Sequence, residues 1–153
     1  MKKIVALILG LTFLFAFAAC GGDKATDKTV DAAAMFQALL TDVTYTDNAT
    51  ELDSSMAGVL LGGELPDGTE AYLAANDSAY LRCAVFACKD KDAAAAVKKL
   101  IQTYIDDSID AKYNVDEVAL LQNAKIHSMG NYVAVAVTSD TDNVNKVIDQ
   151  YFA

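Results

Sequence analysis

Residues 79–92, AYLRCAVFACKDKD, decide the fold. The first ten are apolar apart from Arg82 and include β-branched and aromatic side chains, which predicts a strand over Ala79–Cys88. Asp90 or Asp92 then offers a carboxylate to the first backbone N–H groups of a helix. That helix should extend to about Ile109, because apolar side chains recur at helical spacing: Val97, Leu100, Ile101, Tyr104 and Ile105.

A second strand comes directly before this stretch. Glu70–Ala75 has a strand pattern, and the turn-forming residues Asn76-Asp77-Ser78 join it to Ala79–Cys88. The two strands should therefore form a hairpin, and the hairpin with its helix makes one ββα unit.

The C-terminal part of the chain repeats this order. Ala124–Ser128 and Tyr132–Ser139 flank a turn at Met129-Gly130-Asn131, and Asp140 or Asp142 then caps a last helix. A shift of fifty positions aligns identical residues of the two units: Ala84-Val85 with Ala134-Val135, Asp90 with Asp140, Asp92 with Asp142, and Val97 with Val147. Local physics can select the same residues twice, so the alignment supports a repeated architecture and does not establish gene duplication.

Three further helical segments complete the prediction: Ala32–Leu40 after a cap at Thr29 or Asp31, Glu51–Leu61, and Asn114–Asn123. We therefore predict an α+β fold, with an antiparallel sheet of about four strands from two ββα units and helices packed on one face.

The first twenty residues have the pattern of an export signal. Lys2 and Lys3 precede Ile4–Ala19, where Thr12 is the only residue that is not apolar or glycine. This run is shorter than the roughly 20 residues that span a bilayer. It ends in Ala18-Ala19-Cys20, which resembles a lipobox, with Phe17 where that pattern usually has Leu, Val or Ile. The resemblance implies a diacylglycerol on the Cys20 sulfur and cleavage before it.

These boundaries predict a lipoprotein signal peptide over 1–19, a lipidated Cys20 with a flexible tether over 20–28, and one domain over 29–153. The chain should be anchored on the outer face of the cytoplasmic membrane through lipid on Cys20. Two other interpretations stay open, an ordinary secretory signal with an unrelated cysteine and an uncleaved anchor.

Charge limits the partners. The chain has 12 basic and 21 acidic residues, and removal of Lys2 and Lys3 with the leader changes the net charge from −9 to −11. An acidic surface repels phosphate backbones, so nucleic acid is excluded as a partner.

The remaining cysteines, Cys83 and Cys88, lie five positions apart on one predicted strand. Their side chains should point to opposite faces, too far apart for a disulfide. We therefore expect both to be small buried or half-buried hydrophobic residues.

Most of the chain, Thr29–Phe152, resembles a family. The resemblance depends on four stretches: Val30–Leu40; Ala84-Val85-Phe86 leading into Lys89-Asp90; Tyr113–Val118 with Leu121, Asn123 and Ala124; and Gly130–Val133 with Ser139-Asp140 and Lys146–Ile148. Through them the chain is similar to uncharacterised lipoproteins of clostridia-like Firmicutes, the domain of unknown function 4358. The family tends to carry two glutamates where this chain has Leu81-Arg82. It implies a lipoprotein and this fold, but no activity.

Few residues suggest chemistry. His127, the only histidine, has no partner that the sequence identifies as a nucleophile or an orienting group. Asp106, Asp107 and Asp110 oppose the dipole of a helix C-terminus and form either a solvated face or a weak cation site. The tyrosines could line a ligand cleft, although tyrosines on strands are more often half-buried packing residues with the hydroxyl at the surface: Tyr45, Tyr72, Tyr80, Tyr104, Tyr113, Tyr132 and Tyr151.

We therefore expect no catalytic, cofactor or metal residues, and Cys20 is the one predicted modification site. The first hypothesis is a non-enzymatic binding or interaction module for a small ligand, a peptide or an envelope protein partner. The alternatives are an envelope hydrolase that uses carboxylates and a structural envelope protein.

Overall fold

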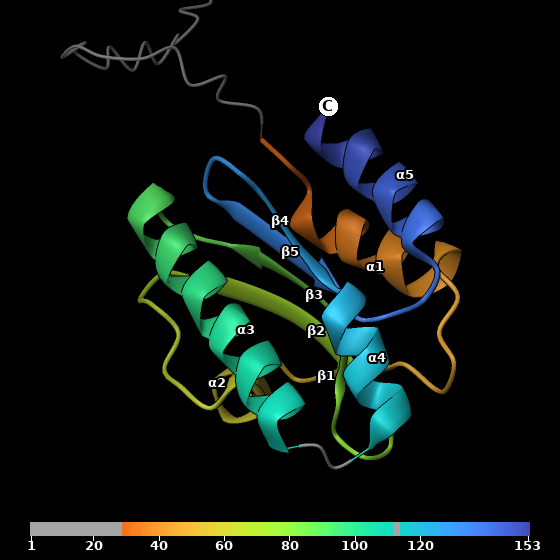
Figure 1. Ribbon diagram of the computed structural model, residues 1–153. Coiled ribbons are helices and arrows are strands. Elements are labelled where there is room, and N and C mark those ends of the chain that lie inside the picture. Colours follow the sequence, from red (N-terminus) through yellow and green to blue (C-terminus); the bar gives the residue numbers. More distant parts are fainter. Residues whose placement is uncertain (1–28, 112–113) are drawn as a thin grey trace, which may run out of the picture.

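Two hairpins form the centre of the molecule. The computed structural model describes residues 29–111 and 114–153, so the predicted leader, Cys20 and tether lie outside the described residues. The elements follow in this order: α1 (Ala32–Asp42), β1 (Thr50–Leu52), α2 (Met56–Leu61), β2 (Glu70–Ala75), β3 (Leu81–Ala87), α3 (Lys91–Ala111), α4 (Val115–Asn123), β4 (Lys125–Met129), β5 (Tyr132–Ala136) and α5 (Thr141–Phe152). Figure 1 shows the strands in one open sheet and the helices around it.

The sheet has five strands in the order β1-β2-β3-β5-β4, and every neighbouring pair is antiparallel. The long strands of the two hairpins therefore pair with each other at the centre, with Ala84 opposite Val135 and Val85 opposite Ala134. The predicted α+β class and antiparallel sheet are confirmed. The strand beyond the four predicted is β1, at one edge.

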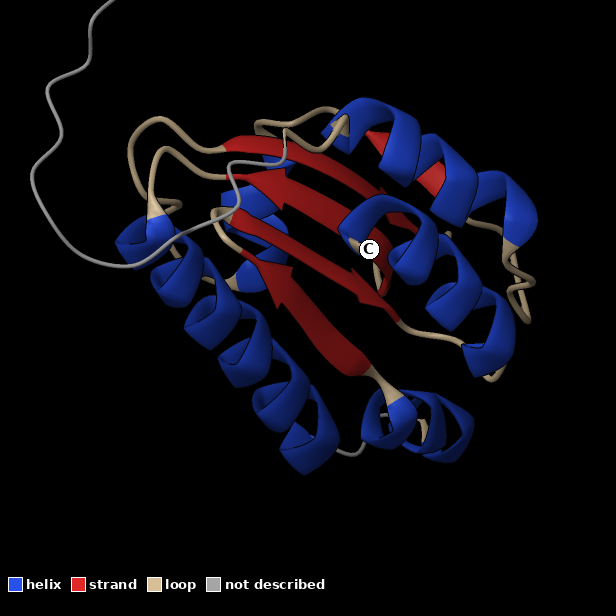
Figure 2. Cartoon of the chain, turned by 90° about the horizontal axis from the view of Figure 1, so that it is seen from above, coloured by secondary structure: helices blue, strands red, loops and turns tan. Residues whose placement is uncertain are grey.

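Helices cover both faces of the sheet, and the prediction that they pack on one face is wrong. One face packs against α1 and α5 through residues such as Phe36, Val85 and Ile148. The other packs against α2 and α3 through residues such as Phe86 and Ile101. Figure 2, seen from above, shows the sheet between these two groups of helices.

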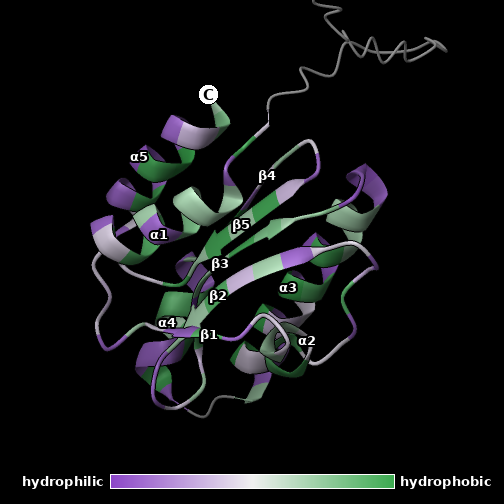
Figure 3. Ribbon diagram, turned by 180° about the vertical axis from the view of Figure 1, so that it is seen from behind, coloured by the Kyte–Doolittle hydropathy of each residue, from purple (hydrophilic) through white to green (hydrophobic). Residues whose placement is uncertain are grey.

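The two units place their helices differently because equivalent residues face opposite sides. Ala84 belongs to the apolar cluster beneath α3, whereas Ala134, fifty positions later, belongs to the cluster beneath α1 and α5. A shift of one residue in strand register turns every side chain to the other face. Figure 3 shows hydrophobic colour on β3 and β5 and an alternation of colours on α3 and α5, which is typical of amphipathic helices over a covered sheet.

Aspartate side chains cap the starts of α1 and α3, but not the start of α5. The carboxylate of Asp31 accepts a hydrogen bond from the Ala34 N–H at 2.9 Å, and that of Asp90 accepts one from the Ala93 N–H at 2.8 Å. Asp140 precedes α5 but makes no side-chain cap to it. Its carboxylate instead accepts the backbone N–H of Thr44 at 2.9 Å, which holds the loop after α1 against the start of α5.

The predicted helix Glu51–Leu61 is wrong in its first half. Thr50–Leu52 forms β1, paired with Leu73–Ala75, and only Met56–Leu61 is helical. Gly62 ends α2 in the left-handed region, with φ of 72°.

Cys83 and Cys88 are free and buried. They belong to the apolar clusters on opposite faces of the sheet, as their spacing predicts. In the described part of the chain no helix is long and apolar enough to cross a bilayer.

Candidate functional site

Arg82 is the only charged residue of β3, and its side chain is 1% exposed. Ala74 of β2 lies opposite Cys83, but Ala75 lies opposite Leu81, so Arg82 is an extra residue on β3. This irregularity has the form of a β-bulge, which re-aims side chains at a strand end. Leu81 consequently packs with the α3 side of the sheet, whereas Cys83, two residues on, packs with the α1 side.

The guanidinium of Arg82 lies between two carboxylates from distant segments. It donates to both oxygens of Glu117 in α4, each at 2.8 Å. It also donates to both oxygens of Asp47, at 2.7 and 2.9 Å, and Asp47 lies in the loop between α1 and β1. The fifth N–H reaches the Leu81 carbonyl oxygen at 3.2 Å. All five donors of the guanidinium are therefore used.

The hydrogen bonds of the cluster shift the pKa values of Asp47 and Arg82 so that both groups stay charged. Hydrogen bonding from Arg82 lowers the pKa of Asp47 to about 2, against the smaller opposing effect of burial. Burial alone would lower the pKa of Arg82, but the hydrogen bonds to Asp47 and Glu117 outweigh it and raise that pKa. Asp47 is consequently ionised near neutral pH and has no proton to donate as a general acid.

The cluster joins three segments of the chain. Asp47 brings in the loop after α1, Glu117 brings in α4, and Arg82 supplies the end of β3. A polar hollow of about 490 Å³ opens onto the cluster, whose three charged residues form part of its wall together with Asn114 and Asp116 of the α4 start. Since all five donors of the buried guanidinium are used by Asp47, Glu117 and Leu81, we interpret the cluster as a structural brace.

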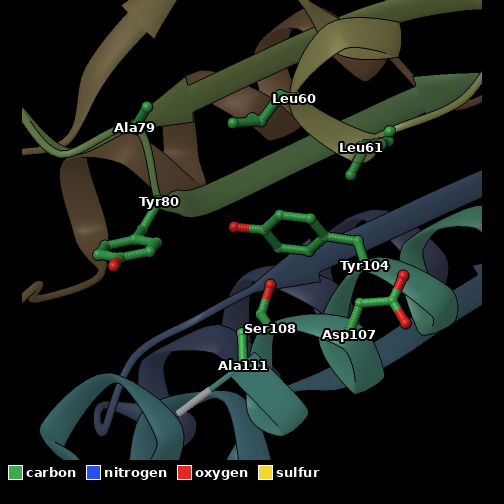
Figure 4. A pocket seen from close by; sticks show the side chains of 9 residues that line it. Leu60, Leu61, Ala79, Tyr80, Tyr104, Asp107, Ser108 and Ala111 are labelled. Atoms are coloured by element: carbon green, nitrogen blue, oxygen red, sulfur yellow. The ribbon is translucent and has the colours of Figure 1, made fainter. Parts of the chain in front are cut away.

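An apolar hollow lies on the α3 side of the same strand end. Its volume is about 390 Å³, and its walls come from α2, the β2–β3 turn and the end of α3. Figure 4 shows Tyr104 extending from α3 towards Tyr80 of the turn, with Leu60 of α2 above them. The Tyr104 hydroxyl oxygen accepts the Leu81 N–H at 3.0 Å, so its ring is held in place next to the arginine brace.

A second apolar hollow, of about 370 Å³, lies on the other side of Leu60. The two hollows share Leu60 and Ala79 as lining residues. Met56 and Val59 of α2 line the second hollow and are 42% and 74% exposed. We call the two together the α2 groove. Apolar hollows with a few polar groups are the usual form of binding sites.

The seven tyrosines are distributed over different parts of the molecule. Tyr80 and Tyr104 line the α2 groove. Four others pack against the cluster beneath α1 and α5: Tyr45, Tyr72, Tyr132 and Tyr151. Tyr113 lies outside the described residues.

The three candidate aspartates of α3 do not form a metal site. Asp107 is at the edge of the α2 groove, whereas the Asp106 carboxylate accepts a hydrogen bond from Gln102 at 2.8 Å. Among the described residues no group of three His, Cys, Asp or Glu side chains is placed to hold a metal ion.

His127 lies on β4, at the sheet edge opposite the α2 groove. Its Nε2 is buried and has no hydrogen-bond partner within the described residues. Burial lowers the pKa of its imidazole, Lys125 lowers it further, and Asp149 opposes both. The neighbouring cavity, of about 10 Å³, is too small for a substrate.

These contacts define an α+β domain in which an antiparallel sheet is enclosed by helices on both faces and one end of β3 is braced by Arg82. Residues 66–138 match the model of the family described as domain of unknown function (DUF4358), which confirms the predicted domain of unknown function over this part of the chain. The match contains Arg82 and Glu117 but not Asp47 or α2. No curated protein and no solved structure matches the chain.

Proposed function

We propose that this chain is a lipid-anchored protein of the outer face of the cytoplasmic membrane, and that its domain is a binding module. The observation that carries the binding role is the α2 groove, where exposed Met56 and Val59 border two apolar hollows. Exposed apolar surface of this kind marks interaction sites, because burying it against a partner is favourable.

The direction of the groove supports this arrangement. In Figures 1 and 3 the start of α1 and the C-terminus lie at one end of the molecule, and α2 lies at the other. A lipid on Cys20 followed by the nine residues 20–28 would place Thr29, three residues before α1, within about 30 Å of the membrane. The groove would then face away from the bilayer.

The hydrolase alternative has less support. Two carboxylates, Asp47 and Glu117, do converge, but Arg82 lies between them and holds both oxygens of each. A pair of catalytic carboxylates needs one group that keeps its proton near neutral pH. The pKa of Asp47 moves in the opposite direction, to about 2.

The anchor is tested with Cys20→Ala in living cells, and Cys88→Ala is the matched control that removes a different thiol. We expect Cys20→Ala to abolish incorporation of labelled palmitate and to leave an uncleaved precursor or a released domain, while Cys88→Ala behaves as the parent chain. Palmitate labelling that persists in Cys20→Ala would contradict the anchor.

The binding role is tested by placing a photo-crosslinking amino acid at Val59 or at Val115 in living cells. Both valines are on helices and strongly exposed, at 74% and 84%, but only Val59 lines the groove. A crosslinked adduct from position 59 and none from position 115 is the expected result. No adduct at position 59, or equal adducts at both, would overturn the binding role.

A further inference from the structure

We propose that the α2 groove binds a basic peptide segment of a partner protein, with one apolar side chain in each hollow. This proposal rests on the binding role above and adds the chemistry of the occupant.

The shape of the groove favours an elongated occupant. Leu60 and Ala79 line both hollows, so the two hollows adjoin each other. A compact ligand in one hollow would leave the other empty and Val59 uncovered. A chain that runs from one hollow to the other places a side chain in each, which is how peptides commonly fill neighbouring apolar pockets.

The charges favour a basic occupant. Each hollow has one aspartate on its wall, Asp77 in one and Asp107 in the other, and both are exposed. Neither hollow has a lysine or arginine among its lining residues. The whole chain carries a net charge of −9, so Lys or Arg beside the apolar anchors would be attracted and oriented.

The same charges disfavour two other occupants. A second copy of this chain would bring a further −9 and another pair of aspartates towards the groove. A bilayer surface with anionic headgroups would be repelled as well. Both occupants are distinguished by the experiment below.

The test selects random dodecapeptides from a phage-displayed library on the full-length chain purified in detergent. Val59→Lys blocks the apolar surface, and Val115→Lys makes the same change on an exposed valine outside the groove. Asp107→Lys reverses a groove charge, and Asp106→Lys is its neighbouring control.

We expect peptides enriched in Lys or Arg next to two apolar residues. Their Kd should rise about tenfold or more with Val59→Lys or Asp107→Lys and stay within about twofold in both controls.

Several results would overturn the proposal. The selected peptides could lack a basic bias, Val59→Lys could leave their binding unchanged, or no peptide could depend on the groove. Self-association of the chain that Val59→Lys abolishes would instead identify a second copy as the occupant. Groove-dependent binding to anionic vesicles would identify a membrane surface. An adduct at position 59 in cells together with non-basic peptides would reject the basic peptide and retain the binding role. Failure of both experiments would reject both.

Discussion

Arg82 and Glu117 are the two buried charged residues of the described part of the chain, and they pair with each other. Replacement of Arg82 by Leu should reduce the free energy of unfolding by about 3–5 kcal/mol, because Glu117 would be left buried without its counter-charge. The double variant Arg82→Leu with Glu117→Leu should be less destabilised than Arg82→Leu alone, since the uncompensated carboxylate is then absent. Urea denaturation of the three chains measures this, and Lys98→Ala on the surface of α3 is the control. Equal losses in the single and double variants would contradict the brace.

The sequence indicates that Arg82 is an unusual residue, but not which residues pair with it. A charged residue inside the apolar stretch 79–88 indicates a paired or functional position. Its partners could not be predicted, because Asp47 and Glu117 each lie thirty-five positions away along the chain and neither has a distinguishing pattern around it. Only the tertiary fold brings the three together.

His127 should make stability depend on pH above the range where carboxylates titrate. Burial lowers the pKa of its imidazole, so the unfolded chain binds more protons at a given pH than the folded chain does. The stabilisation is complete above the unfolded pKa of about 6.5 and is lost as the pH falls from there towards the lower folded value. Unfolding in urea at pH 7.5 and 5.5 should show lower stability at pH 5.5, with a smaller difference in His127→Gln. The same pH dependence in both chains would show that His127 is not its source.

At the scale of elements, the β2–β3 turn carries local strain. Ala79 has φ of 62°, in the left-handed region that favours glycine. The Asn76 side-chain oxygen accepts the N–H groups of Ser78 and Tyr80, which holds the turn in this form. Ala79→Gly should therefore stabilise the chain by about 0.5–1 kcal/mol. Thermal unfolding measures the change.

The control for this prediction is Ala95→Gly. Ala95 is an exposed residue inside α3, where glycine is expected to destabilise by about 0.5–1 kcal/mol. Opposite signs for the two substitutions are the expected outcome. A loss of stability in Ala79→Gly equal to that in Ala95→Gly would mean that the turn is not strained.

Most elements were predictable because local patterns agree with the tertiary fold. Glu70–Ala75 is a strand with the predicted bounds, and both hairpins and their helices are present. The exception is Thr50–Leu52, where three residues are too few to show a period. Their strand conformation comes from pairing with β2, which is a tertiary contact. Because β1 and the start of α2 border the groove, its position could not be predicted, and the sequence did not distinguish Tyr80 and Tyr104 from the other five tyrosines.

At the scale of the whole molecule, the one-face prediction missed a signal that was present. Strands with one solvated face alternate between apolar and polar residues, whereas strands covered on both faces are apolar throughout. Residues 83–88 and Val133–Val137 have no alternation, and both stretches are almost entirely buried. The uninterrupted apolar runs of the two central strands are therefore the sequence signal that helices cover both faces of the sheet.

Two apolar clusters separated by the sheet should contribute independently to stability. Ile101 of α3 packs on one face and Ile148 of α5 on the other, at 0% and 6% exposure. Each Ile→Val change should cost about 0.5–1.5 kcal/mol, because one methylene is removed from a packed core. Since the two side chains belong to separate clusters, the double variant should lose the sum within about 0.5 kcal/mol. Urea denaturation of the two single variants and the double variant decides this. A negligible effect of Ile148→Val would mean that α5 does not cover the sheet, and strong non-additivity would mean that the two faces are not separate cores.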